Sequence, residues 1–222
     1  MNLFSKDNSL DLVRKAGIAL IAVSALIIFL TFFPVIWEEA KYQLLPKHDD
    51  VPVLTREEVG DAVKNGEDTP SDVIYPVDED FGIVIPKIGA NAKVIADVDW
   101  QDSTVYQRAL TKGVAHAAGT SYPDEPGNVF IFSHSGVDFY EANRYNALFY
   151  LLNKLVPGEE IYLFYKGQKF VYRVIDKKIV APESVEYLKG DPKKRTLTLM
   201  TCWPAGTTLK RLVVIAELSV NR

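Results

Sequence analysis

The apolar residues of this chain form one long N-terminal segment, followed by many short runs. Residues 16–37 contain no charged side chain over 22 positions. A helix of that length spans roughly 33 Å, enough to cross the apolar core of a bilayer. The segment ends in PVIWEE (34–39), a poor signal-peptidase site, and it lacks the polar stripe of a buried core helix. We therefore predict an uncleaved transmembrane helix over 16–37 rather than a cleaved signal peptide or a core helix.

The charges that flank this helix predict its orientation. Residues 1–15 carry three positive and two negative side chains, and Glu38 and Glu39 follow the helix. Positive flanks stay on the cytoplasmic side of a membrane. We therefore expect a cytoplasmic tail over 1–15 and everything from residue 38 onward outside the cell, in a single-pass membrane protein.

The residues after the helix are expected to form a spacer and then one β-rich domain. Residues 38–78 are rich in charges and turn formers, with one short helix expected in TREEVGDAVKNG (55–66), where Thr55 and Glu58 fit a capping box. From residue 79 the pattern changes to short runs rich in Val, Ile and aromatic residues, which are typical of strands. These runs are FGIVIP (81–86), NAKVIADV (91–98), VFIFS (129–133), EIYLFY (160–165), QKFVYRVI (168–175), TLTLMT (196–201) and RLVVIAELSV (211–220).

One helix is expected among these strands. Leu148, Leu151, Leu152 and Leu155 recur at helical spacing before Pro157 and Gly158. Many short strands with one or two short helices indicate a mostly β barrel or sandwich over 79–222.

Charge and cysteine content narrow the possible functions. The net charge is −4, and subtracting the +1 of residues 1–15 leaves −5 for the rest of the chain. That balance argues against a nucleic-acid partner. Cys202 is the single cysteine, so the chain has no internal disulfide. A lone thiol outside the cytoplasm is either a buried apolar residue or a nucleophile.

Cys202 stands at the end of a predicted strand, before the turn WPAG (203–206). A thiol there is held by the sheet and suits a nucleophile, although it also fits the last buried residue of the strand. Its reactivity requires a neighbouring base or positive charge.

Of three histidines, His134 is the preferred proton carrier. It directly follows the strand VFIFS, whereas His116 lies in GVAHAAGT, which we expect to be a loop, and His48 lies in the polar spacer. Arg211 opens the last predicted strand. If that strand pairs antiparallel with the one that ends at Cys202, Arg211 lies beside the cysteine, where a cation stabilises an oxyanion.

These residues carry a family resemblance. The segment TLMTCWPAGTTLKRLVVIA resembles the signature of the sortases, in which a TLxTC strand precedes an arginine that opens the final strand. GTSYPDEPGNVFIFSHS resembles the stretch that leads to the family's histidine, and FGIVIPKIGANAKVI resembles its opening strands. The chain departs from the family where Ser133 and Ser135 flank His134, and at Asp124, where Gly is common.

The resemblance implies a closed β-barrel and a cysteine transpeptidase with Cys202, His134 and Arg211 as catalytic residues. It implies cleavage of an LPxTG-like sorting motif near the C-terminus of secreted proteins, through a thioacyl-enzyme. The acyl group would pass to an amine on a cell-wall precursor or a pilin. Sequence reasoning adds candidate substrate contacts at Thr120, His116, Thr201 and Trp203, and the backbone amide of Thr201 or Trp203 is a candidate oxyanion donor.

Covalent acyl transfer requires no cofactor, and the histidines and cysteine lack the spacing of a zinc site. Glu183 and Glu186 are expected to be solvated rather than metal ligands, so no metal is predicted.

Three alternatives stay open. The first is a membrane-tethered binding domain with a degenerate sortase fold and no catalysis. The second is an enzyme that mainly hydrolyses its target. The third is an L,D-transpeptidase, which is disfavoured because the Ser-His-Gly-Cys motif is absent and 68 residues separate His134 from Cys202.

Overall fold

The computed structural model describes residues 5–44, 51–66, 71–135 and 148–219. The chain forms two compact units, Met1–Leu45 and Pro46–Arg222. His48 and residues 136–147, which precede the predicted helix near Leu148, lie outside the described residues.

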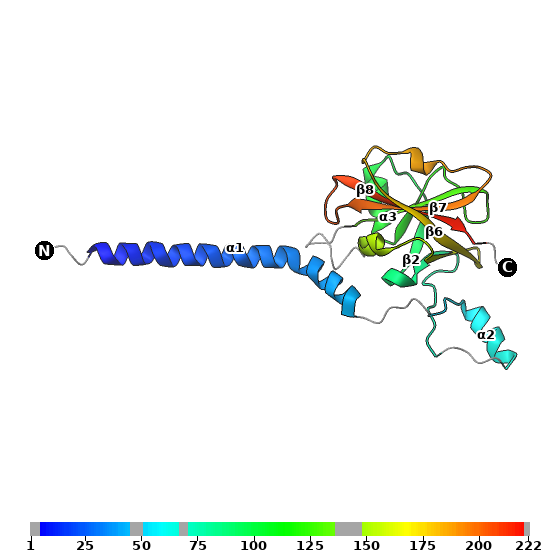
Figure 1. Ribbon diagram of the computed structural model, residues 1–222, viewed down its shortest axis with the longest axis horizontal. Helices are drawn as coiled ribbons and strands as arrows, with labels where there is room; N and C mark the ends of the chain where they lie inside the picture. Colours follow the sequence, from blue (N-terminus) through cyan, green and yellow to red (C-terminus); the bar gives the residue numbers. More distant parts are fainter. Residues whose placement is uncertain (1–4, 45–50, 67–70, 136–147, 220–222) are drawn as a thin grey trace. The chain divides into compact units, whose positions relative to one another are not determined.

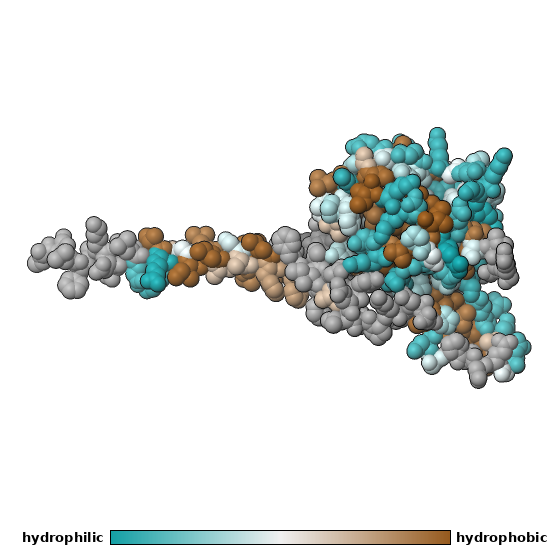
Figure 2. All heavy atoms as spheres, in the orientation of Figure 1, coloured by the Kyte–Doolittle hydropathy of each residue, from teal (hydrophilic) through white to brown (hydrophobic). Residues whose placement is uncertain are grey.

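The first unit is a single long helix, α1 (Ser5–Leu44) (Figure 1). Within it, Asp11–Leu30 has a mean hydropathy of 2.1 and no buried residue, so this helix is long and apolar enough to cross a membrane. Apolar side chains are exposed along it (Figure 2), Leu20 and Ile21 for example at 68% and 72%. The prediction of an N-terminal apolar helix is confirmed, with a helical range wider than 16–37.

The second unit is built on a closed barrel, in the order β1-β2-β3-β4-β7-β8-β6-β5. The β2–β3 and β4–β7 pairs are parallel and the other pairs are antiparallel. The strands are β1 (Phe81–Ile85), β2 (Ala90–Val98), β3 (Val114–Ala117), β4 (Gly127–Phe132), β5 (Glu160–Tyr165), β6 (Gln168–Val180), β7 (Arg195–Trp203) and β8 (Lys210–Leu218). The predicted closed β-barrel is confirmed.

Period-two alternation along the strands separates an interior face from an outer face. Leu197 and Leu199 of β7 point into the main core, as do Leu212 and Val214 of β8. The intervening residues of these strands therefore face outward. The β5–β6 hairpin turns at Lys166 and Gly167, whose φ values of 51° and 74° suit a two-residue turn.

Short helices connect and cover the strands. They are α2 (Arg56–Lys64), η1 (Pro86–Ile88), α3 (Ser103–Leu110), η2 (Tyr150–Lys154) and η3 (Glu186–Leu188), where η denotes a 3₁₀ helix. The helix expected near Leu148 is the 3₁₀ helix η2 rather than an α-helix. Phe149, Leu152 and Leu155 are fully buried at a spacing of three, which is the period of a 3₁₀ helix.

The segment before the barrel also packs on it. Thr55 caps α2 in the predicted capping box with Glu58, and Lys169 of β6 pairs with Glu58 at 2.5 Å. Val53 is buried against Val84 and Phe164. Part of the expected spacer over 38–78 therefore contacts the barrel directly.

Two elements in this unit differ from the prediction. GVAHAAGT, expected to be a loop, contains the strand β3, because Val94 and Ile95 of β2 pair with residues 114 and 115. The helix α3 was not predicted, although Asp102 caps it by accepting hydrogen bonds from two backbone N–H groups. Both elements are short, and their apolar residues are covered by tertiary packing in one outer cluster.

Candidate active site

The parallel pair β4–β7 brings His134 to the level of Cys202. Phe132 pairs with Met200, and beyond this pair the N–H of Ser133 donates to the Met200 carbonyl at 3.1 Å. The Thr201 hydroxyl donates to the Ser133 carbonyl at 2.9 Å. His134 and Cys202, which are distant in the sequence, therefore lie at the same end of the barrel.

The antiparallel pair β7–β8 places Arg211 directly opposite Cys202. Directly paired residues have Cβ atoms roughly 5 Å apart on the same face of the sheet. The expectation that Arg211 lies beside Cys202 is confirmed.

Cys202 and Arg211 lie on the outer face of the barrel, because they alternate with the interior Leu199 and Leu212. His134 lies two residues beyond the end of β4. Cys202, His134 and Arg211 are each half-buried. The thiol of Cys202 is free, so it is reachable yet held by a regular strand.

The loop between β7 and β8 holds the guanidinium of Arg211. Its Nη1 donates to the carbonyls of Thr208 at 3.2 Å and Lys210 at 3.1 Å. These two are the hydrogen bonds that the Arg211 guanidinium makes with the described residues. A guanidinium has five N–H donors, so most of them are not used in these two bonds. Arg211 therefore keeps donors for a developing negative charge beside Cys202.

Of the predicted substrate contacts, Thr201 and Trp203 lie next to Cys202 in β7 but on the other face. The Thr201 side chain is 3% exposed, and Trp203 packs against the interior core. The Thr201 hydroxyl ties the ends of β4 and β7 together. The assignment of an oxyanion donor to either backbone amide stays a prediction.

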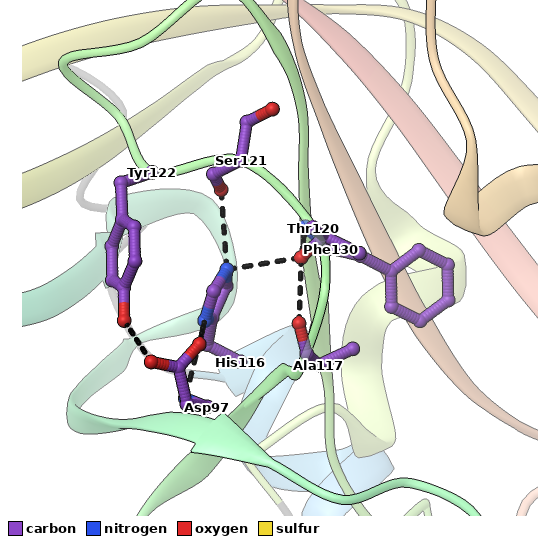
Figure 3. Close-up of polar contacts among 7 residues, drawn as sticks. All are labelled: Asp97, His116, Ala117, Thr120, Ser121, Tyr122 and Phe130. Carbon is purple, nitrogen blue, oxygen red and sulfur yellow. Dashed lines mark hydrogen bonds and ion pairs between the residues drawn. The ribbon is translucent and has the colours of Figure 1, made fainter.

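The structure does not bring His116 to Cys202. His116 is paired with the interior Ile131 and is fully buried. Its Nδ1 accepts from the N–H of Asp97 at 3.3 Å, and its Nε2 lies 3.1 Å from the Ser121 carbonyl (Figure 3). This pattern fits a neutral ring with the proton on Nε2.

Thr120 and Tyr122 complete this buried cluster. Thr120 Oγ1 lies 3.0 Å from His116 Nε2 and donates to the Ala117 carbonyl, and the Tyr122 hydroxyl donates to Asp97 at 2.6 Å (Figure 3). These contacts hold the connection between β3 and β4. A direct contact of Thr120 or His116 with substrate stays a prediction.

The buried His116 predicts an acid-sensitive fold. Burial lowers the pKa of His116 below its ordinary value, so the unfolded chain binds a proton that the folded chain excludes. The contribution of this pKa difference to the free energy of unfolding is fully present above the unfolded pKa of about 6.5. As pH falls below that value, the free energy of unfolding declines by up to about 1.4 kcal/mol per pH unit until the folded pKa is reached. We expect urea unfolding, monitored by tryptophan fluorescence, to show that the free energy of unfolding falls more between pH 7.5 and 5.5 in the wild type than in His116→Gln.

The matched control is His134→Gln, since His134 is half-buried at the candidate active site. This variant should retain the wild-type loss of stability between the two pH values. Equal losses in the wild type and His116→Gln would contradict the role assigned to His116.

An apolar patch next to the candidate active site was missed by sequence reasoning. Phe132, two residues before His134, belongs to an outer cluster of buried apolar residues, and Met200, Tyr106 of α3 and Tyr187 of η3 pack against that cluster. The rings of Tyr106 and Phe132 meet edge to face at 6.2 Å. The sequence feature that could have indicated this patch is Asp102, the N-cap residue of α3.

Among the described residues, no three His, Cys, Asp or Glu side chains gather as a metal site. Glu183 and Glu186 are exposed on the β6–β7 loop. The chemistry available here is therefore that of a thiol, an imidazole and a guanidinium.

Comparisons with known proteins agree with this arrangement. The family model described as the sortase domain matches residues 83–219. Sortase D of Bacillus subtilis (strain 168) is 27% identical over 136 residues, so the match spans 60% of this chain and only 60% of that relative. The structure of sortase C-1 from Actinomyces oris is 30% identical, with 65% of this chain and 75% of that chain covered and a TM-score of 0.55. A lid mutant of sortase A from Corynebacterium diphtheriae is 26% identical, with 65% and 72% covered and a TM-score of 0.54.

Proposed function

Because this chain belongs to the sortase family, we propose that it is a cysteine transpeptidase that acts on secreted proteins with a C-terminal sorting signal. The observation that carries the proposal is the direct pairing of Cys202 with Arg211, with His134 two residues beyond the end of β4, the strand that pairs with β7. These three residue types supply a nucleophile, an oxyanion partner and a proton carrier.

The proposed first half-reaction is acylation. The Cys202 thiol passes its proton to His134, and its sulfur attacks the carbonyl carbon of the scissile peptide bond. The guanidinium of Arg211 stabilises the negative oxygen of the tetrahedral intermediate. The intermediate collapses with cleavage of the C–N bond. His134 gives a proton to the departing amine, which leaves a thioacyl-enzyme.

The proposed second half-reaction returns the enzyme to its starting state. An acceptor amine attacks the thioester carbon and loses a proton to His134, and the Cys202 thiolate departs. An LPxTG-like motif in the acyl donor, and an amine on a cell-wall precursor or a pilin as acceptor, are the substrates that the family resemblance favours. No cofactor enters either step.

We also propose that α1 anchors the enzyme with residues 1–15 in the cytoplasm and the barrel outside. Tethering at the membrane raises the effective concentration of enzyme near membrane-bound substrates. Because Cys202 is the single cysteine, a membrane-impermeant maleimide applied to intact cells should label it. Labelling that appears only after lysis would contradict this orientation.

The test of the activity is intact-mass analysis of the full chain in detergent with LPxTG-like peptides, with and without an amine acceptor. We expect a peptide adduct on Cys202 that resolves to an amide product when the acceptor is present. Release of free acid alone with acceptor present would favour the hydrolase alternative. Absence of any adduct, together with a Cys202 that is inert to thiol reagents, would favour the degenerate binding domain.

A further inference from the structure

A buried asparagine ties the β6–β7 loop to the barrel. Asn128 of β4 is 4% exposed, and its Nδ2 donates to the carbonyls of Tyr187 at 2.9 Å and Leu188 at 3.4 Å. Its Oδ1 accepts from the hydroxyls of Thr196 and Thr198 of β7, both at 3.0 Å. We call these three side chains, Asn128, Thr196 and Thr198, the Asn128 latch.

The chemistry of its partners fixes the orientation of this amide. Two backbone carbonyls can only accept, so the NH₂ group must face the loop. Both donor hydrogens and both acceptor positions of Asn128 are then used, which is the arrangement that makes a buried polar group stabilising rather than costly.

A glycine in the loop provides independent evidence of close contact. A Cβ added to Gly190 would lie 2.5 Å from the Asn128 Cβ and 3.1 Å from the Thr196 hydroxyl. The loop backbone thus rests directly on Asn128, with no space for a side chain between them.

The latched loop lies over the apolar patch beside the candidate active site. Tyr187 and Leu188, whose carbonyls Asn128 holds, pack against the outer cluster that contains Phe130 and Phe132, and Met200 packs against the same cluster. Met200 is on the same outer face of β7 as Cys202, two positions before it. The Asn128 latch therefore lies at one end of the outer face of β4 and β7, and Cys202 lies at the other end.

We propose that Asn128 is a positioning residue that holds the β6–β7 loop as one wall of the surface on which the acyl-donor peptide lies beside Cys202. This proposal rests on the proposed function. The apolar character of the patch favours a donor with apolar side chains next to its scissile bond. Asn128 contacts neither the thiol nor Arg211, so it should affect peptide binding rather than chemistry.

The test compares Asn128→Asp with Asn91→Asp in the full chain in detergent. N128D replaces the NH₂ donor by an oxygen that faces two carbonyls. N91D makes the same change outside the latch, on β2, where the Asn91 Nδ2 donates to the Tyr75 carbonyl at 2.7 Å. In N128D we expect KM for a sorting peptide to rise about tenfold, which corresponds to about 1.4 kcal/mol, with kcat within twofold of wild type. Amide hydrogen exchange over residues 185–190 should also become faster. In N91D both KM and the exchange rate should stay within twofold of wild type.

Several outcomes would overturn this inference. Unchanged exchange over 185–190 in N128D would show that Asn128 does not hold the loop. Faster exchange with an unchanged KM, or a KM rise of equal size in N91D, would show that the loop position does not govern peptide binding. A kcat that falls with KM unchanged would assign Asn128 to chemistry instead.

A second variant covers failure of N128D to fold. Gly190→Ala leaves the latch residues intact but forces the loop away from Asn128, and it should raise KM in the same way; an unchanged KM would count against the proposal. Absence of any peptide adduct on the wild type would overturn the proposed function and the peptide-binding part of this inference. The exchange comparison would still decide whether Asn128 holds the loop.

Discussion

Cys202→Ala is expected to leave the barrel folded and to abolish every covalent adduct with a sorting peptide. Cys202 is the single cysteine, so no other thiol can replace it. Its side chain is half-buried on the outer face of β7 rather than in the core, and substitutions outside the core usually change stability by under about 0.5 kcal/mol. Intact-mass analysis detects the adduct, and circular dichroism with a thermal scan reports on the fold.

Cys202→Ser is the matched variant for this prediction. It preserves the shape of the side chain and replaces the thiol by a hydroxyl, which is a weaker acid and a poorer nucleophile. We expect this variant also to be folded and inactive. Cleavage of a sorting peptide by Cys202→Ala at the wild-type rate would contradict the transpeptidase assignment, whatever the state of the serine variant.

Arg211→Ala is expected to lower kcat/KM for peptide cleavage by about 10²–10³, the range observed when a preorganised oxyanion donor is removed. Arg211 lies opposite Cys202, and two loop carbonyls hold its Nη1. The other donors are thereby fixed in direction. Arg211→Lys should recover less than tenfold of the loss, because an ammonium is a point charge that lacks the planar fork of the guanidinium.

Two controls isolate this effect. Arg173 of β6 pairs with Glu160 on the barrel surface, and Arg173→Ala should change kcat/KM by less than twofold. Alkylation of Cys202 by iodoacetamide forms no tetrahedral oxyanion, so its rate should change little in Arg211→Ala. A parallel fall in alkylation and peptide cleavage would mean that Arg211 acts on the thiol itself.

The strands that carry the candidate active site could be predicted because their residues alternate or form uninterrupted apolar runs. The runs ending at Ser133 and Thr201 locate β4 and β7, and Arg211 follows from the start of β8. The adjacency of Cys202 and Arg211 required one further assumption, antiparallel pairing across a short loop, which is the common outcome for consecutive strands.

Other features depend on contacts that no local pattern reveals. The segment around His116 has the small residues of a loop, yet it becomes β3 because it pairs with β2 and β4. Asn128 looks like part of a turn in PGN, and its partners in the β6–β7 loop are 59 and 60 residues away. The buried position of His116 likewise involves contacts with Asp97 and Ser121, which approach it only in the folded barrel.

The position of β8 has a consequence for the order in which the enzyme becomes competent. β8 lies between β6 and β7 in the barrel and also supplies Arg211. β8 follows β7 in the sequence, so Cys202 precedes its guanidinium partner along the chain. The strand that joins β7 to β6 and completes the barrel is thus the strand that brings Arg211 to Cys202. Closure of the barrel and assembly of the candidate active site are therefore the same event, and a barrel left open at β8 has the thiol without its cation.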